Sequence, residues 1–431
     1  MNKALSFKSK NEIDSYQSIQ LARQMEYVID HSPFYKDHLT GFSAGRLSST
    51  DDLRSLPVTT KEQLQKRNMD FLCVPRHRII DYITTSGTTG DPVTFALTEK
   101  DLERLADNEH ASFVCADGTP EDIYQLMLTL DRRFMAGLAY FLGLRKLGAG
   151  IIRVGPGNAV LQFDTIQRTS PTVLVTLPSF LLTLVEYAEK NHIDLAATSV
   201  KSAVCIGEPI RDSHFMLNKL GKRIKSKWDI KLYSTYASTE MAAAFTECGY
   251  GEGGHLNPEM IVVEFLDEQN NPVKEGELGE VTITNLGVEG MPLVRFKTGD
   301  ICYHFTHTCK CGRNTMRLGP IVGRKNQMIK YKGTTLFPSS FYEILNEIEE
   351  VKNYVVEVST NSIDTDDILV IVGSKQQSPQ VEKEIKDHFR AKLRVAPSIR
   401  FLDPEEVHKI QFPKMNRKPV TFIDKRSHDP A

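Results

Sequence analysis

The chain has 431 residues and a formal net charge of −2, with 40% hydrophobic and 25% charged residues. Its composition is that of an ordinary globular protein, and its length exceeds what one hydrophobic core usually supports, so two or three domains are expected. The absence of net positive charge argues against a nucleic-acid-binding protein. The longest apolar run, residues 134–144, is too short to span a bilayer. Seven cysteines without a preceding signal sequence indicate a reducing compartment, and we expect a cytoplasmic protein without a membrane partner.

The N-terminal third contains one helical pattern and one unusual loop. The helical pattern ends at HSPFY, residues 31–35. The loop lies in ITTSGTTGDP, residues 83–92, in which seven of ten residues are Ser, Thr or Gly. Small residues let backbone N–H groups approach an anion and hydroxyls add further donors, so the segment is either a phosphate-binding loop or a flexible turn. A Walker A loop is excluded because its lysine is missing.

The middle of the chain alternates short apolar strands with helical patterns. The strand TVLVT (172–176) precedes a helix that begins near Pro178, and the strand SAVCIG (202–207) precedes a helix through Phe215 and Leu220. This alternation predicts a parallel sheet covered by helices. Residues 259–300 differ, because strand-like runs separated by a turn-rich segment indicate antiparallel strands.

Beyond Gly323 the pattern restarts as a smaller unit. We expect helices at 341–349 and 380–392 and strands near 353–359, 368–373 and 399–402. The expected fold is therefore α/β, with parallel and mixed sheets in a large N-terminal domain and a small α+β tail. The predicted domains are residues 1–325 and 326–431, both within the usual range of domain sizes or slightly above it.

Four further segments carry candidate functional groups. YASTE (236–240) places a carboxylate after two hydroxyls at the end of a predicted strand, where ligands bind in open α/β sheets. RFKTGD (295–300) contains an aspartate of the kind that accepts a pair of ribose hydroxyls. GRKNQMIKYKGTTLFP (323–338) begins with an arginine next to a glycine, and RKPVTFIDKR (417–426) supplies a lysine near the C-terminus. Each segment alone is also typical of a solvated turn.

In this order and spacing, the segments resemble motifs of the adenylate-forming superfamily, specifically its phenylacetate–CoA ligase branch. SGTTGDP is similar to the family's phosphate loop SGTTGKP, YASTE to Y-G-x-[ST]-E, and RFKTGD to R-[YF]-[RK]-T-[GR]-D. The segment from residue 323 is similar to G-R-x-D-D-M-[IL]-x-x-x-G-x-x-x-F-P, and RKPVTFID to the terminal GKxxxxID. SPFY, TLPSFLL and IGEP agree with shorter family marks, and the resemblance extends over residues 30–426.

The chain departs from the family pattern at several motif positions. Asp91 stands where the family has lysine, which would place a negative charge beside the triphosphate. Ala237 replaces a glycine, Asn326 and Gln327 replace the paired aspartates at the interdomain hinge, and Arg417 replaces a glycine before the terminal lysine. An exposed charge at position 91 would be partly screened by solvent and salt.

The resemblance implies an AMP-forming ligase that activates a carboxylic acid with ATP and transfers the acyl group to CoA. It assigns the catalytic roles to Lys418, Glu240 and Thr239, and Glu240 with Thr239 would hold Mg²⁺. The residues implied to bind ATP or AMP are Ser86, Gly87, Thr88, Thr89, Gly90, Gly207, Glu208, Pro209, Tyr236, Ala237, Ser238, Asp300 and Arg324. The tail domain would rotate about Asn326 between half-reactions, and the hairpin around Gly333 would form the entry path of the thiol.

The family's acyl pocket falls on Phe134, Ala136, Gly137 and Ala237, and small residues beside a phenylalanine favour an aromatic or arylacetic acid. The same segment is equally typical of an apolar core helix. The preceding LDRRF (130–134) could add a cation near the pocket mouth, which would favour a hydroxylated, amino or longer acid.

A cysteine-rich segment indicates a metal site. DICYHFTHTCKCGR (300–313) follows ECGYGEGGH (247–255) along the chain. By resemblance to relatives with cysteines in these places, the ligands of a structural zinc would be Cys248, His255, Cys309 and Cys311. A Cys₃His set suits tetrahedral Zn²⁺. Cys302 or His304 could take the place of His255, and ordinary reduced cysteines are the alternative.

Two other functions stay open. An adenylating ligase that loads an acyl carrier protein or an amine would carry the same phosphate and lysine motifs. A non-catalytic nucleotide-sensing or zinc-stabilised binding protein would explain the departures in the loop and at the hinge, although Glu240, Asp300, Arg324 and Lys418 are all retained. The resemblance also suggests a homodimer.

Overall fold

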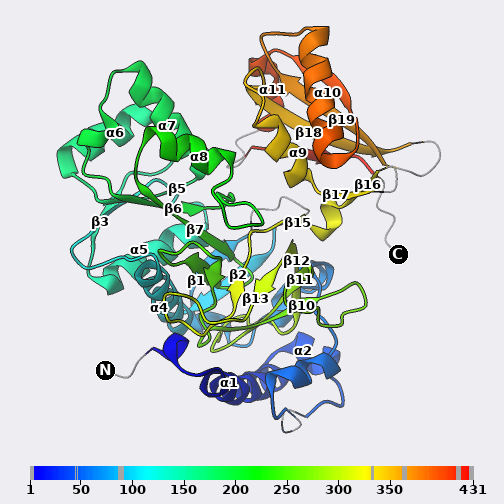
Figure 1. Cartoon of the computed structure of the whole chain (residues 1–431). Coiled ribbons are helices and arrows are strands. Elements are labelled where there is room, and N and C mark those ends of the chain that lie inside the picture. The colour runs from blue at the N-terminus through cyan, green and yellow to red at the C-terminus, as the bar shows by residue number, and fades with distance from the viewer. Residues whose placement is uncertain are drawn as a thin grey trace. The chain divides into compact units, whose positions relative to one another are not determined.

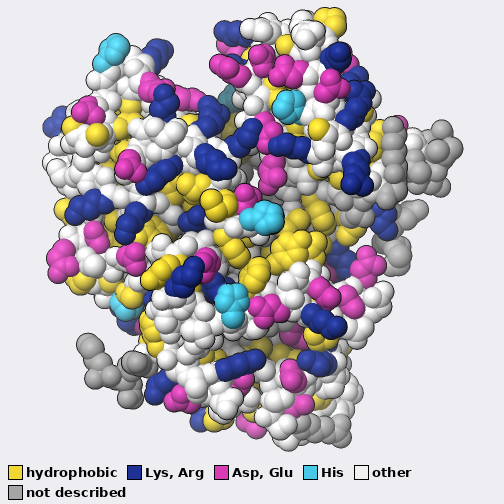
Figure 2. All heavy atoms as spheres, in the orientation of Figure 1, with side chains coloured by type: hydrophobic (Ala, Val, Ile, Leu, Met, Phe, Trp, Pro, Cys, Tyr) yellow, Lys and Arg dark blue, Asp and Glu magenta, His cyan; other side chains and the backbone are white. Residues whose placement is uncertain are grey.

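The computed structural model describes residues 4–43, 45, 47–85, 92–331, 334–361, 366–413 and 419–426. The chain divides into two compact units, Met1–Ile321 and Val322–Ala431 (Figure 1). This division falls close to the expected boundary between residues 325 and 326. Among the described residues, no helix combines the length and the apolar character that crossing a bilayer requires. On the face shown in Figure 2, acidic and basic side chains are interspersed.

The main sheet of the first unit has the strand order β13-β14-β9-β8-β7-β6-β5-β3-β4. Its parallel strands are β3 (Ile123–Leu126), β4 (Gly150–Arg153), β5 (Val173–Thr176), β6 (Ser202–Ile206) and β7 (Lys231–Ser238). The antiparallel strands are β8 (Ala243–Glu247), β9 (Gly254–His255), β13 (His304–Phe305) and β14 (Arg317–Leu318). The helices between the parallel strands are α5 (Met135–Leu147), α6 (Ala159–Thr169), α7 (Pro178–Lys190) and α8 (Lys219–Lys227). The predicted parallel sheet and its alternation with helices are confirmed.

The helix predicted through Phe215 and Leu220 is correct only in its second part, because α8 begins at Lys219 and contains Leu220 but not Phe215. Residues 207–218 form a loop, Phe215 has a left-handed φ of 61°, and an isolated bridge pairs Arg211 with Leu217. Asp212 explains the difference, because its carboxylate accepts hydrogen bonds from the backbone N–H groups of His214 and Met216. Such local side-chain bonds compete with helix formation.

The rest of the first unit consists of smaller sheets and further helices. The strands β10 (Ile261–Leu266), β11 (Gly279–Asn285) and β12 (Phe296–Cys302) are antiparallel, as predicted, and β1 (Ile79–Thr84) pairs with β2 (Thr94–Thr98). The α-helices are α1 (Lys10–His31), α2 (Pro33–His38), α3 (Lys61–Lys66) and α4 (Glu99–Cys115). Short 3₁₀ helices are η1 (Leu5–Phe7), η3 (Thr50–Ser55), η4 (Asn68–Phe71), η5 (Arg76–Arg78) and η6 (Leu195–Ala197).

The second unit is an α+β fold. Its four-stranded sheet has the order β20-β19-β18-β21, formed by β18 (Asn353–Thr360), β19 (Asp366–Gly373), β20 (Ser398–Leu402) and β21 (Phe422–Asp424). Its other elements are β15 (Gly323–Arg324), η7 (Lys325–Gln327), β16 (Ile329–Tyr331), β17 (Thr334–Leu336), α9 (Pro338–Leu345), α10 (Pro379–Leu393) and α11 (Pro404–Gln411). The expected strands are confirmed. The helix expected at 341–349 begins earlier, because Pro338 occupies the first turn, where a missing N–H costs nothing.

The helices α4 and α5 pack closely around a buried acid. A Cβ added at Gly143 would lie 2.4 Å from the Cβ of Glu109, so the glycine permits this approach. The Glu109 Oε1 accepts a hydrogen bond from Asn108 at 3.1 Å, whereas Oε2 is buried without a partner in the described part of the chain. Burial raises the pKa of Glu109 to about 8.

This raised pKa predicts a pH-dependent stability. Between the ordinary pKa of 4.5 and about 8, the unfolded chain releases the Glu109 proton and the folded chain keeps it. The free energy of unfolding should therefore fall as pH rises through this window, by at most about 1.4 kcal/mol per pH unit. Glu109→Gln removes this dependence, so the variant should gain stability over the wild type from pH 5 to pH 8 in urea unfolding. Glu103→Gln, at an exposed position of the same helix, is the control, and a constant difference for Glu109→Gln would contradict the assignment.

Candidate active site

The YASTE segment forms the end of β7 and the turn after it. Tyr236, Ala237 and Ser238 are the last three residues of the strand. Thr239 and Glu240 begin a turn from which β8 returns, with Ala237 paired to Ala244. Both turn residues are half-buried. The carboxylate of Glu240 therefore lies at the carboxyl end of a sheet strand, as the sequence predicts.

A buried arginine of α4 holds this turn in place. The guanidinium of Arg104 donates to the carbonyls of Ala242 at 2.6 Å, Leu286 at 2.8 Å and Met260 at 2.5 Å. The side-chain amide of Asn285 donates to the carbonyl just before Ala242 at 2.7 Å. Burial lowers the pKa of Arg104 to about 10, so the side chain stays charged at neutral pH. The turn that carries Glu240 is thus fixed by groups beneath it.

The motifs YASTE and RFKTGD meet in one hydrogen bond. The Tyr236 hydroxyl donates to Oδ2 of Asp300, the last residue of RFKTGD, at 2.6 Å. The backbone N–H of Asp300 donates to Oγ1 of Thr298, and the Tyr236 ring stacks on Phe245 with centroids 6.0 Å apart. Burial, followed by the Asp300 carboxylate, raises the pKa of the Tyr236 phenol well above its ordinary value. The phenol therefore stays a hydrogen-bond donor that orients the carboxylate.

The stem of the Ser/Thr/Gly loop is closed by two hydrogen bonds. The N–H of Thr85 donates to the carbonyl of Val93, and the N–H of Val93 donates to Oγ1 of Thr85, both at 3.0 Å. Residues 86–91, which include the predicted phosphate ligands Ser86 to Gly90, lie outside the described residues. The stem residues Thr85 and Val93 directly continue the pairing of β1 with β2, whose last pair is Thr84 with Thr94.

The IGEP segment follows β6 as a partly exposed loop. Gly207 has a φ of 71°, a conformation that glycine adopts readily. The two carboxylate oxygens of Glu208 accept hydrogen bonds from the N–H and the hydroxyl of Ser179 at 2.9 and 2.8 Å, which caps the first turn of α7. Both oxygens of the Glu208 carboxylate are thus engaged by Ser179.

The predicted acyl-pocket residues lie at the start of α5. Phe134 is its N-cap and is half-buried, as is Ala136. Gly137 is buried, and a Cβ there would lie 2.1 Å from the carbonyl oxygen of Thr129. Gly137 therefore has a packing role in addition to any role in a pocket.

The predicted residues of the tail domain belong to the second unit. Arg324 lies in β15, and Asn326 is exposed in η7, where its carbonyl accepts a hydrogen bond from Arg426 at 3.4 Å. Gly333 and Lys418 lie outside the described residues.

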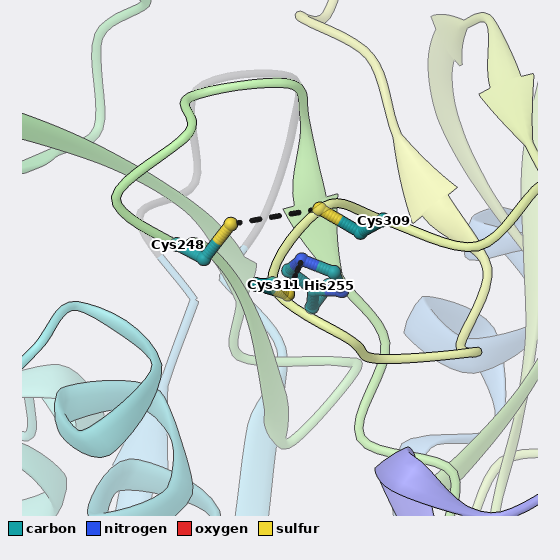
Figure 3. Close-up of side chains that lie close together, drawn as sticks. All are labelled: Cys248, His255, Cys309 and Cys311. Carbon is teal, nitrogen blue, oxygen red and sulfur yellow. Dashed lines mark hydrogen bonds between the residues drawn. The ribbon is translucent and has the colours of Figure 1, made fainter.

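Four side chains predicted as zinc ligands converge in the first unit (Figure 3). The ligand atoms of Cys248, His255, Cys309 and Cys311 all lie within 4.8 Å of one another. The sulfurs of Cys248 and Cys309 are 3.7 Å apart, and the sulfur of Cys311 is 3.5 Å from Nε2 of His255. Around a tetrahedral zinc with Zn–S of about 2.3 Å and Zn–N of about 2.0 Å, two sulfur ligands lie roughly 3.8 Å apart, and a sulfur and a nitrogen ligand roughly 3.5 Å apart. These two pairs therefore have the spacing that zinc needs.

The environment of His255 suits a metal ligand as well. Burial, followed by the charges of Arg313 and Arg317, lowers the pKa of His255 to about 3, so the imidazole is neutral. Its Nδ1 lies 3.1 Å from Oγ1 of Thr315. A hydrogen bond donated from Nδ1 to this hydroxyl leaves Nε2 with a lone pair that points toward Cys311. The sequence did not predict the roles of Thr315 and Arg104, because a single polar residue in a helix or a turn is expected to be exposed.

Comparison with known proteins assigns the family. The profile of AMP-binding enzymes matches residues 11–290, and the profile of the AMP-binding enzyme C-terminal domain matches residues 333–426. The chain belongs to the AMP-binding enzyme family.

The curated relatives include phenylacetate–coenzyme A ligases. The protein from Thermus thermophilus is 28% identical over 79% of this chain and 77% of the relative, and that from Escherichia coli is 26% identical over 86% and 84%. Among solved structures, a 2-hydroxyisobutyryl-CoA ligase in the postadenylation state is similar with a TM-score of 0.84 and 21% identity, covering 97% of this chain and 91% of that chain. This similarity supports the α/β fold with a smaller C-terminal domain.

The contacts of Arg104 predict a large effect of its removal. Arg104→Met keeps the side-chain bulk but leaves three buried carbonyls without their donor, which should lower the free energy of unfolding by about 3 kcal/mol or more. Urea unfolding of both proteins gives the difference. Arg54→Met removes an exposed arginine that pairs with Asp51 and should change stability by about 0.5 kcal/mol or less. Equal effects of the two substitutions would contradict the role of Arg104.

Proposed function

We propose that the protein is an ATP-dependent, AMP-forming acid–CoA ligase. The observation that carries the proposal is the 2.6 Å hydrogen bond between Tyr236 and Asp300. It joins two segments far apart in sequence that each resemble a nucleotide-binding motif of adenylate-forming enzymes. Membership of the AMP-binding enzyme family and the names of the curated relatives support the same reaction.

The proposed reaction has two half-reactions. A substrate carboxylate attacks the α-phosphorus of ATP, and pyrophosphate leaves with the electron pair of the broken P–O bond. The product is an acyl-adenylate, whose carbonyl carbon is then attacked by the thiolate of CoA, with AMP as the leaving group. Two anions meet in the first step, so positioning and charge neutralisation supply most of the catalysis.

The nucleotide would lie at the carboxyl ends of β6 and β7. In this proposal the Asp300 carboxylate accepts the ribose hydroxyls while the Tyr236 hydroxyl holds it in orientation. The loop from Gly207 to Pro209 lines the adenine through its backbone. The Tyr236 ring lines the adenine as well. Ser86, Thr88 and Thr89 hold the phosphates, and Arg324 helps to orient the nucleotide.

Glu240 and Thr239 are the proposed ligands of Mg²⁺. A carboxylate and a hydroxyl are the oxygen ligands that this hard cation prefers. When bound, Mg²⁺ would neutralise charge on the phosphates. The backbone of the turn that follows Glu240 is held by Arg104 and Asn285, so the position of the turn does not depend on a ligand.

The proposed substrate is an aromatic or arylacetic acid. Phe134, Ala136 and Ala237 offer one aromatic ring and two small side chains, and the relatives from Thermus thermophilus and Escherichia coli are named for phenylacetate.

Between the two half-reactions the tail domain would rotate about Asn326, with Gly333 at the entry path of the thiol. This rotation would exchange the adenylation arrangement for the thioester-forming one.

One assay tests the proposed function and its acceptor. ATP–pyrophosphate exchange is measured with a panel of carboxylic acids, and the acids that support exchange are then tested with CoA, with an acyl carrier protein and with amines. We expect exchange with aryl acids and AMP release only with CoA. Exchange followed by transfer to the carrier protein or to an amine would change the acceptor, and no exchange with any acid would overturn the reaction.

The proposed role of Lys418 gives a sharp test. A lysine that stabilises the transition state at the α-phosphate is needed for adenylation but not for thiol attack. Lys418→Ala should lower the rate of pyrophosphate exchange by about 10²–10³-fold and leave thioester formation from a supplied acyl-adenylate nearly unchanged. Lys414→Ala is the matched control four residues away. Normal exchange in the first variant with loss in the second would reassign the lysine.

We also propose that Cys248, His255, Cys309 and Cys311 bind one structural Zn²⁺. Four protein ligands leave no position for a reactive water, so the ion would cross-link the loop after β8 to the segment after β13. Cys309→Ser should reduce bound zinc and lower the melting temperature, because metal binding contributes to folding. Cys73→Ser, a buried cysteine outside the cluster, is the control for zinc content. Metal analysis of the wild type that gives well under one zinc per chain after chelator-free purification would remove the site.

A further inference from the structure

The loop that carries Cys309 and Cys311 also binds the turn formed by residues 5–8. The backbone N–H of Asn314 donates to the carbonyl of Ser6 at 2.9 Å, and the side-chain amide of Asn314 donates to the carbonyl of Lys8 at 2.8 Å. The turn consists of η1 and the residue after it. These two hydrogen bonds attach this N-terminal turn to the end of the cysteine loop, far away in sequence.

Arg313 contacts both the cysteine set and the N-terminal turn. Its Nη1 donates a hydrogen bond to the sulfur of Cys311 over 3.5 Å. Its Cζ lies 4.7 Å from the centroid of the Phe7 ring, which is within the range of a cation–π interaction. Both Arg313 and Phe7 are half-buried. One guanidinium therefore links a proposed zinc ligand to an aromatic ring of the turn.

The backbone of the cysteine loop sets the position of Arg313. The N–H of Gly312 donates to the carbonyl of Cys309 at 2.8 Å, and the N–H of Cys309 donates to the carbonyl of Arg313 at 3.0 Å. Gly312 has a φ of 86°, which glycine adopts readily and other residues seldom do. The tight turn through Gly312 therefore places the arginine beside the sulfurs.

The charge of the proposed zinc site gives this cation a role. The imidazole would bind as a neutral ligand and the three cysteines as thiolates, which together carry one more negative charge than Zn²⁺ neutralises. Cys248 and Cys309 are buried, so solvent screens the remaining charge poorly. A hydrogen bond from a guanidinium to a thiolate is charge-assisted, and such outer partners tune metal affinity.

Two other cations near the set have a carboxylate partner. Nζ of Lys310 lies 2.7 Å from one oxygen of Glu252, and Nη1 of Arg317 lies 3.5 Å from the other. Arg313 differs from both, because its guanidinium contacts a sulfur and an aromatic ring.

We propose that Arg313 neutralises the excess charge of the zinc-bound thiolates and couples zinc binding to the docking of the N-terminal turn. This inference rests on the proposed zinc site, and it makes Arg313 a positioning residue and not a ligand. Coupling between two binding events is reciprocal. Zinc should therefore hold the turn in place, and the docked turn should strengthen zinc binding.

The first test measures the zinc affinity of the full chain by competition with a chromophoric chelator. Arg313→Gln should weaken zinc binding by about 10- to 100-fold, and Arg313→Lys, which keeps the charge, should recover part of the loss. Phe7→Ala should weaken it by about 2- to 5-fold, the equivalent of one cation–π contact. Lys310→Gln removes a positive charge from the same loop and should stay within about twofold of the wild type, because Lys310 pairs with Glu252. Circular dichroism melting checks that the variants fold.

A spectroscopic readout separates this role from a general loss of stability. A hydrogen bond to a metal-bound thiolate lowers the energy of the sulfur lone pair. In the cobalt-substituted protein, Arg313→Gln should therefore shift the sulfur-to-cobalt charge-transfer band to longer wavelength, whereas Lys310→Gln should leave it in place. An unshifted band in Arg313→Gln would contradict the hydrogen bond to the ligand.

Hydrogen–deuterium exchange of peptides that cover residues 4–9 tests the reciprocal effect. Removal of zinc from the wild type should speed exchange in the turn by about fivefold or more, while peptides from α10 in the second unit should not change. In Arg313→Gln, exchange in the turn should no longer depend on zinc. Zinc affinities that are equal in Arg313→Gln and Lys310→Gln would overturn the inference, as would exchange in the wild-type turn that ignores zinc. A wild type that binds no zinc would remove the proposed zinc site itself and this inference with it.

Discussion

The position of the proposed active-site turn depends on the hydrogen bonds that the Arg104 guanidinium donates. The guanidinium is buried in the first unit and bonds three carbonyls that belong to separate loops, at Ala242, Met260 and Leu286. A buried cation requires such partners, and the loops in turn lose their donors if the cation is removed. The turn with Glu240 is therefore placed by the interior of the protein and not by the ligand, which is the preorganisation that electrostatic catalysis requires.

The same principle extends to the neighbouring groups. The Asp300 carboxylate is oriented by the Tyr236 hydroxyl, and the stem of the Ser/Thr/Gly loop is closed through Thr85 and Val93. These groups come from segments distant in sequence, and the parallel strands bring the ends of β6 and β7 to one edge of the sheet. Ligands of open α/β sheets bind at this edge.

The Cys/His cluster lies in the first unit on the segments after β8 and β13, where a bound metal would join the two loops.

The sequence predicted the features that recur regularly. Strands, their parallel and antiparallel character, and the cysteine set followed from periodicity and from family motifs. The helix expected through Phe215 and Leu220 begins only at Lys219, because the Asp212 carboxylate forms local hydrogen bonds that the apolar pattern does not reveal. The burial of Arg104 and Glu109 was not predicted either, because a charged residue on a helix is expected to face solvent. The carbonyls that bind Arg104 are far away in sequence. The packing of Gly137 against a backbone carbonyl is another tertiary contact without a local signal.

Isotope transfer from the acid to the nucleotide tests the central claim most directly. The acid that supports pyrophosphate exchange is labelled with ¹⁸O in both carboxylate oxygens and converted in the presence of ATP and CoA. If the carboxylate attacks the α-phosphorus and AMP later leaves from the acyl carbon, one ¹⁸O appears in each AMP by mass spectrometry. AMP without ¹⁸O, or label in inorganic phosphate together with ADP, would contradict an acyl-adenylate intermediate.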